Sequence, residues 1–117
     1  PDGFTKGDWL NDTVFWVQRA VADGYRVVGY NYWSIVDNYE WGQYDSRFGL
    51  YTVNALTDPT LKRIPTNGPA TFRKITATGG APRDYKLKSP LRFCPLSEGI
   101  RSCVNPPKVD GPRAVLK

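Results

Sequence analysis

The residues best suited to chemistry lie in one stretch, from Trp33 to Phe48, which reads W-S-I-V-D-N-Y-E-W-G-Q-Y-D-S-R-F. Pyranose rings have apolar C–H faces that stack on indole, as one amphipathic surface on another. Their hydroxyls need acceptors and donors around the rim, and a carboxylate such as Glu40 forms charge-assisted hydrogen bonds that are stronger than neutral ones. This mixture of tryptophan, carboxylate and small polar groups indicates carbohydrate recognition.

The same stretch has a purely structural interpretation. Its aromatic residues would then be ordinary core side chains, and Asp37 would make hydrogen bonds to loop backbone amides. Asp37 and Glu40 lie three positions apart on a loop and nothing in the sequence fixes their separation, so we do not expect them to form a catalytic pair. We expect Asp37 to be structural.

The composition excludes several other kinds of site. The chain has no histidine, which excludes histidine-based acid–base catalysis and most zinc or haem sites within it. Two cysteines without histidine cannot make a four-ligand zinc site. We therefore expect no metal and no cofactor.

The elements that must position the stretch begin with a helix expected over Trp9–Asp23. Its apolar residues recur at spacings of four, three and four, with Asp8 as the predicted N-cap, and Gly24 is suited to the left-handed residue that ends a helix. Residues 26–33 are β-branched and aromatic, which predicts a strand buried on both faces. A helix followed by a buried strand is typical of α/β folds.

Downstream, residues 49–54 alternate and predict a short extended strand, and residues 57–66 are rich in turn formers. Pro69 suits the first turn of a helix to about Thr76, with Phe72 and Ile75 facing inward. Residues 81–117 contain six of the ten prolines, which predicts an irregular tail. We therefore divide the chain into an ordered part, 1–78, and a proline-rich basic tail, 79–117.

Charge and cysteines separate the same two parts. Residues 1–58 carry four basic and eight acidic side chains, whereas residues 59–117 carry twelve basic and three acidic ones. The aromatic residues cluster in the acidic half, which argues against a nucleic-acid groove, and no apolar run is long enough to span a membrane.

Cys94 and Cys103 predict a disulfide in the tail and favour a secreted or other oxidising compartment; two free cytosolic thiols are the alternative.

The run V-V-G-Y-N-Y-W-S-I-V-D-N-Y-E-W, followed by R-F-G-L-Y, resembles the C-terminal signature of family-1 glycoside hydrolases of the β-glucosidase type. The resemblance extends from about Trp9 to Ile75. It implies an α/β fold, namely the last helix–strand–helix segment of a (β/α)₈ TIM barrel. A whole barrel needs about 250 residues, and the family's Asn-Glu-Pro and Thr-Glu-Asn-Gly motifs, which carry its two catalytic carboxylates, are absent. The resemblance therefore implies no catalytic residue in this chain, which begins just after the expected position of the nucleophile motif.

The resemblance also implies roles for four residues. Trp33 would be the floor on which the non-reducing-end sugar stacks, Glu40 would bind its 4- and 6-hydroxyls, Trp41 would donate to the 3-hydroxyl, and Phe48 would line the pocket. A glutamate at position 40 suits an unphosphorylated sugar, since a carboxylate repels phosphate. The loop between Trp41 and Arg47 is one residue shorter than the family pattern, a departure that concerns the aglycone side.

Two hypotheses follow from the sequence. In the first, the chain is the glycone-binding segment of a retaining β-glycosidase that hydrolyses terminal, unphosphorylated β-linked hexoses. In the second, it is a noncatalytic carbohydrate-binding or structural subunit derived from such an enzyme. A lone helix–strand–helix piece exposes an apolar face, so we expect the remainder of the barrel, a partner chain or self-association to cover it.

Overall fold

The computed structural model describes residues 3–89, 111–112 and 116. The elements follow the order α1 (Lys6–Ala22), β1 (Tyr51–Thr52), β2 (Ile64–Pro65) and α2 (Gly68–Thr78). Within these residues no helix is both long and apolar enough to cross a membrane. Cys94 and Cys103 lie outside the described residues, so their pairing stays a prediction.

Helix α1 begins earlier than its apolar spacing predicts. Thr5, and not Asp8, is the N-cap: its hydroxyl accepts from the Asp8 amide, while the Asp8 carboxylate accepts from the Thr5 amide at 3.0 Å. This reciprocal capping box satisfies two amides that the first turn leaves free. Gly24 follows the helix at φ 90°, as expected for a left-handed residue.

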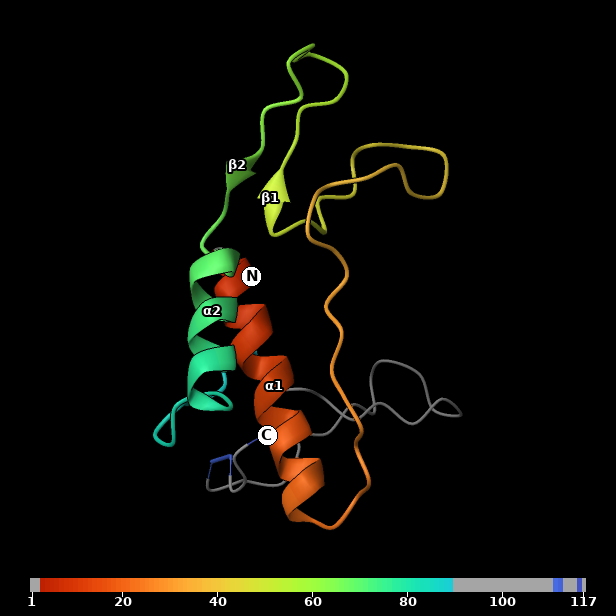
Figure 1. Cartoon of the computed structure of the whole chain (residues 1–117). Coiled ribbons are helices and arrows are strands. Elements are labelled where there is room, and N and C mark those ends of the chain that lie inside the picture. Colours follow the sequence, from red (N-terminus) through yellow and green to blue (C-terminus); the bar gives the residue numbers. More distant parts are fainter. Residues whose placement is uncertain (1–2, 90–110, 113–115, 117) are drawn as a thin grey trace, which may run out of the picture.

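The two helices lie side by side and run in the same direction (Figure 1). Their first turns meet where the Asn67 side chain accepts from the Gly7 amide at 3.0 Å and donates to the Thr5 hydroxyl at 2.8 Å. Helix α2 starts with Pro69 in its first turn and ends at Gly79, with φ 76°. The predicted second helix is thus confirmed, and Ile75 is buried as expected.

The predicted strand over residues 26–33 is not formed. The segment is extended and returns along α1 toward the starting ends of the two helices (Figure 1). A strand requires a hydrogen-bonded neighbour, and within the described residues no other strand lies beside this segment. The expectation of burial on both faces was also wrong, since Val28 is 91% exposed.

The observed sheet is a small antiparallel pair, with Tyr51 opposite Pro65 and Thr52 opposite Ile64. Beside it lies a core of Leu10 and Val14 from α1, Leu50 before β1, and Ile75 from α2. Several partly buried residues pack against this core: Tyr30, Tyr32, Tyr51, Phe72 and Leu116. Through Leu50, the core therefore connects the end of the loop that follows Trp33 to both helices.

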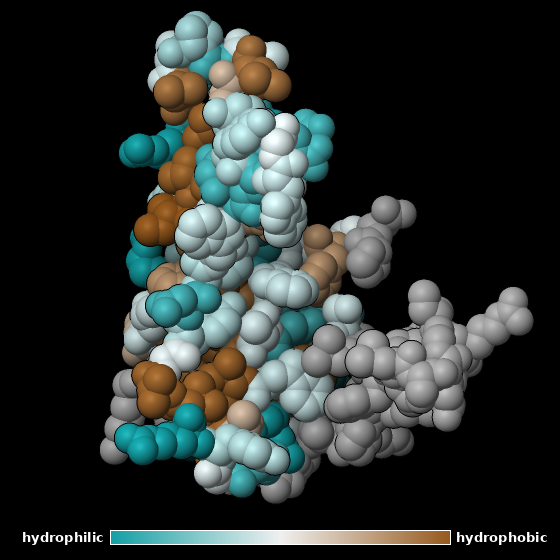
Figure 2. Space-filling view, turned by 90° about the vertical axis from the view of Figure 1, so that its right-hand side faces the viewer, coloured by the Kyte–Doolittle hydropathy of each residue, from teal (hydrophilic) through white to brown (hydrophobic). Residues whose placement is uncertain are grey.

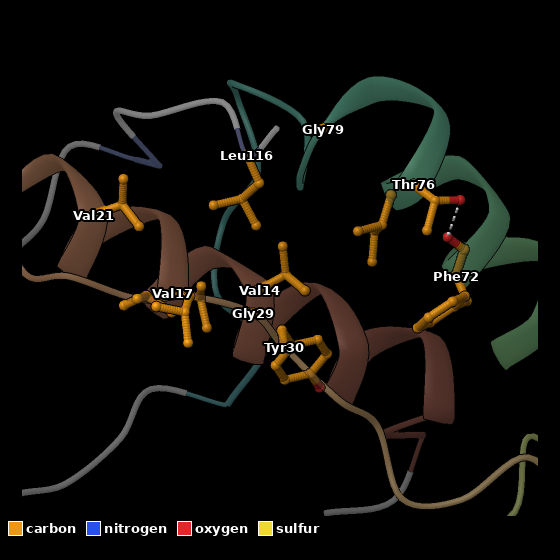
Figure 3. Close-up of a pocket in the computed structure, with 12 residues that line it drawn as sticks. Val14, Val17, Val21, Gly29, Tyr30, Phe72, Thr76, Gly79 and Leu116 are labelled. Atoms are coloured by element: carbon orange, nitrogen blue, oxygen red, sulfur yellow. Dashed lines mark hydrogen bonds between the residues drawn. The ribbon is translucent and has the colours of Figure 1, made fainter.

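An apolar groove of about 680 Å³ runs between α1, the extended segment and α2. Figure 3 shows Val14, Val17 and Val21 projecting into it from α1, with Phe72 on α2 and Leu116 at its rim. Apolar residues also reach the surface on the face drawn in Figure 2. Residues 3–89, with 111–112 and 116, thus leave a large hydrophobic surface uncovered among themselves.

Candidate functional site

A tight hairpin carries the central residues of the candidate site. Glu40 and Gln43 exchange both backbone hydrogen bonds, at 2.9 and 3.1 Å. The two residues between them, Trp41 and Gly42, have φ 46° and 86°. Positive φ at both central positions is the geometry of a type I′ turn. This turn closes the loop after Glu40 and places Trp41 at its tip, 85% exposed.

Trp33 and Glu40 form the first of two contacts within the site. The Trp33 indole Nε1 donates to the Glu40 Oε1 at 2.5 Å, across seven positions of sequence. Trp33 remains 67% exposed, so its ring offers an open apolar face beside a negative charge. This combination can stack on one side of a sugar and accept hydrogen bonds at its edge.

Trp41 and Phe48 form the second contact. Their rings meet edge to face, with centroids 6.3 Å apart and planes at 86°. The ammonium of Lys6 lies 6.0 Å from the Phe48 centroid, and Lys6 also donates to the Arg47 carbonyl. Partial burial lowers the pKa of Lys6, and the nearby Asp37 charge opposes that effect. Lys6, in the first turn of α1, therefore links that helix to this pair.

Backbone hydrogen bonds hold the two pairs on one platform. Residues 34–37 lie beside residues 48–51, with Leu50 N donating to Ser34 O and Tyr51 N to Ile35 O, both at 2.9 Å. Gly49 permits this approach, because a Cβ there would lie 2.2 Å from the Asp37 nitrogen. The Tyr32 hydroxyl adds a bond of 2.8 Å to the Phe48 carbonyl. These bonds connect the chain after Trp33 to the chain around Phe48.

Asp37 anchors the loop, which confirms its expected structural role. Its carboxylate accepts from the Gly49 amide at 2.8 Å, the Val53 amide at 3.3 Å and the Arg47 guanidinium at 3.1 Å. The Asp37 side chain is only 3% exposed. A carboxylate engaged in this way is not free to act as a nucleophile or acid, so Asp37 and Glu40 do not form a catalytic pair.

The structure brings the four predicted residues together as two pairs, joined by the peptide bond between Glu40 and Trp41. Within the described residues, no hydrogen bond or ring contact links one pair to the other. Neither the apolar groove nor a second cavity of about 410 Å³ beside Tyr30 and Phe72 includes any of the four. Within the described part of the chain the four residues thus form an exposed surface, with Trp33 and Trp41 67% and 85% exposed.

Two supporting residues were missed by the sequence reasoning. Arg47 joins Asp37 to the Val53 carbonyl at 2.6 Å and the Asn54 side chain at 3.3 Å. Its opposite charge ten positions from Asp37 was the available signal. Lys6 precedes Phe48 by more than forty positions, and no local pattern connects them.

The part of the chain that the structure describes holds no cluster of three metal-ligating His, Cys, Asp or Glu side chains.

A family model and individual relatives assign the chain to the same kind of protein. A family model described as Glycosyl hydrolase family 1 matches residues 5–81. A beta-galactosidase of Pyrococcus woesei is 43% identical over 65 residues, covering 54% of this chain and 12% of that protein. A beta-galactosidase of Sulfolobus acidocaldarius is 38% identical over 80 residues, covering 67% of this chain and 16% of that protein.

A third relative is beta-glucosidase 26 of Oryza sativa subsp. japonica, 38% identical over 63 residues, which cover 53% of this chain and 12% of that protein. The chain thus spans between 12% and 16% of the length of these relatives. No solved structure gives a significant match to the chain.

Proposed function

The chain belongs to glycosyl hydrolase family 1, and from this premise we propose that it is the glycone-binding segment of a retaining β-glycosidase. The substrate of the intact enzyme is a terminal, unphosphorylated β-linked hexose. The two carboxylates that retaining hydrolysis requires, about 5 Å apart, are supplied by parts of the enzyme outside this chain. The chain alone is inactive and contributes recognition.

The observation that carries the proposal is the contact between the Trp33 indole and the Glu40 carboxylate. It unites an exposed aromatic face and a hydroxyl acceptor on a segment within the family match. In the proposal, Trp33 stacks on the sugar, Glu40 accepts from its 4- and 6-hydroxyls, and Trp41 donates to its 3-hydroxyl. Phe48 lines the same pocket, whose remaining walls come from other parts of the enzyme.

The arrangement of the backbone supports a place in a (β/α)₈ barrel. Two parallel helices, with an extended segment that follows the first in sequence and runs back along it, have the helix–strand–helix order of α/β folds (Figure 1). The extended segment over residues 26–33 would then become a barrel strand when neighbouring strands pair with it. The apolar groove and the exposed Val28 support a need for such a partner.

The proposal is tested in the intact enzyme that carries this chain. Glu40→Ala removes the acceptor for two sugar hydroxyls, and we expect kcat/KM for an aryl β-glucoside to fall about 100-fold or more. Asp45→Ala, an exposed acidic residue of the same loop, is the matched control and should leave kcat/KM within about twofold. Near-normal turnover by the Glu40 variant contradicts the proposal.

A noncatalytic carbohydrate-binding subunit derived from such an enzyme is the second candidate. It is favoured by the commitment of Asp37 to backbone amides and Arg47, which leaves Glu40 without a catalytic partner in the described chain. Binding of a β-glucoside by the 117-residue chain alone, followed by tryptophan fluorescence, distinguishes the two. Saturable binding without hydrolysis supports the subunit, whereas absence of binding favours the enzyme segment.

A further inference from the structure

Residues 80–89, which we name the strap, are hydrogen-bonded to helix α1 through the buried carboxylate of Asp12. Asp12 is only 6% exposed. One of its oxygens accepts from the Tyr85 hydroxyl at 2.8 Å and the Lys88 amide at 3.0 Å, and the other accepts from the Ser89 amide at 2.7 Å. Because an unpaired buried carboxylate is costly, helix α1 depends on the strap to satisfy Asp12.

A second contact between the strap and α1 lies six positions further along the helix. The Gln18 side chain, 3% exposed, accepts from the Ala81 amide at 2.8 Å. Gly80 makes this contact feasible, since a Cβ there would lie 2.3 Å from the Gln18 amide nitrogen, and its φ of 152° disfavours other residues. The strap thus meets α1 at both of the helix's buried polar side chains.

The strap contacts α1 at positions that border the side facing the core. Leu10 and Val14 point into the core cluster, whereas Phe15 is buried at 1% exposure without belonging to that cluster. Phe15 lies three positions from both Asp12 and Gln18 and is therefore a neighbour of each on the helix surface, whereas Gln18 also lies four positions after the core residue Val14. Most of the strap also lies beyond residue 81, where the family match ends.

We propose that the strap is an intramolecular clamp that holds the start of the tail against α1 through Asp12 and Gln18. The family-matched part of the chain and the start of the tail then form one folded unit. The bonds to Asp12 hold the strap in place, so that weakening them opens the strap before the helices separate. This inference does not depend on sugar recognition.

Limited digestion of the whole 117-residue chain with trypsin tests the clamp. Three cleavage positions lie in the strap, after Arg83, Lys86 and Lys88, and two reference positions, after Lys62 and Arg63, lie in an exposed loop. In the unaltered chain we expect cleavage in the strap to be at least about tenfold slower than in the loop. Equal rates in strap and loop overturn the proposal.

Two variants extend the test. Tyr85→Phe removes one donor with little change of shape, and Asp12→Asn replaces an acceptor oxygen with a donor group facing the Ser89 amide. Each should raise strap cleavage about tenfold, the effect of losing a hydrogen bond to a charged group, without changing cleavage in the loop. Asp45→Asn, at an exposed position outside the strap and away from the counted cleavage positions, is the control. Unchanged strap cleavage in Tyr85→Phe contradicts the clamp even if Asp12→Asn fails to fold.

Discussion

The Trp33 indole and the Glu40 carboxylate are joined by a hydrogen bond of 2.5 Å. The type I′ turn that follows Glu40 turns the chain back, so that the neighbouring Trp41 contacts Phe48 instead. One aromatic–carboxylate pair and one aromatic–aromatic pair are thereby built from a stretch of sixteen residues, and the bonds of Asp37 and the close approach at Gly49 hold their backbone together.

Trp33 and Glu40 should act as a coupled pair in substrate recognition. In the intact enzyme, Trp33→Phe keeps an aromatic face but removes the indole donor, so Glu40 loses the bond that orients it. A double-mutant cycle with Trp33→Phe and Glu40→Ala, measured on kcat/KM, should give a coupling free energy of about 1 kcal/mol. Strict additivity would mean that the two residues act independently.

Asp37→Asn should destabilise the loop strongly. The amide nitrogen introduced at one oxygen position faces donors, the Arg47 guanidinium and the Val53 amide. Breaking this buried arrangement should lower the free energy of unfolding by about 3 kcal/mol, measured by urea denaturation. The exposed Asp45→Asn serves as the control and should change it by less than about 0.5 kcal/mol. A small effect at Asp37 would refute its anchoring role.

Gly49→Ala should be poorly tolerated for a steric reason. Its Cβ would lie within 2.6 Å of three backbone atoms of residues 36, 37 and 51, so side-chain adjustment cannot relieve the clash. We expect a loss of at least about 2 kcal/mol in the free energy of unfolding. Gly29→Ala is a matched control, because a Cβ there meets nothing within 4 Å. Similar stabilities for the two variants would argue against the close backbone approach.

The capping box of α1 should make stability depend on pH in the acidic range. Hydrogen bonds from the Thr5 side chain and backbone hold the pKa of Asp8 below its ordinary value. Since the folded pKa is below the unfolded one, about 3.9, this contribution is fully present above pH 4. It is lost as the pH falls through the folded value.

Comparison of the unaltered chain with Asp8→Ala between pH 7 and pH 2 measures this contribution. Their unfolding free energies should differ most above pH 4 and converge at the acidic end. Thr5→Ala, which removes the N-cap hydroxyl, should cost about 1 kcal/mol at neutral pH. A difference between the chain and Asp8→Ala that stays constant over the whole range would exclude the capping carboxylate as its source.

The sequence predicted the two helices well because their signals are local. The apolar spacing of α1 and the Pro69 start of α2 are set within a few residues, and both helices formed. The start of α1 was misplaced because Asp8 is the third residue of a capping box, whose N-cap Thr5 lies three positions earlier. A polar residue near a helix start is compatible with either position.

The strand over residues 26–33 could be predicted only as a tendency. Its β-branched and aromatic residues favour extension, and the segment is extended, but pairing depends on neighbours that the described residues do not provide.

At the candidate site, the sequence stretch from Trp33 to Phe48 was enough to predict which residue types would be present. The Trp33–Glu40 contact depends on a turn formed by Trp41 at positive φ, which few non-glycine residues adopt.

The tail shows the same dependence on distant partners. Proline content predicted irregular structure, and residues 81–89 form neither helix nor strand. Asp12 and Tyr85 are more than seventy positions apart, so no spacing rule could reveal their bond. Burial raises the pKa of Tyr85, and the hydrogen bond to Asp12 adds to this effect.

The most direct measurement compares two substrates in the intact enzyme, an aryl β-glucoside and its 6-phosphate, with Glu40 and with Glu40→Ser. A carboxylate that accepts from the 4- and 6-hydroxyls repels a 6-phosphate. Therefore kcat/KM with Glu40 should strongly favour the unphosphorylated sugar, and Glu40→Ser should narrow that preference about tenfold or more, equivalent to about 1.4 kcal/mol. An unchanged preference in the variant would contradict the assignment of Glu40 to the sugar.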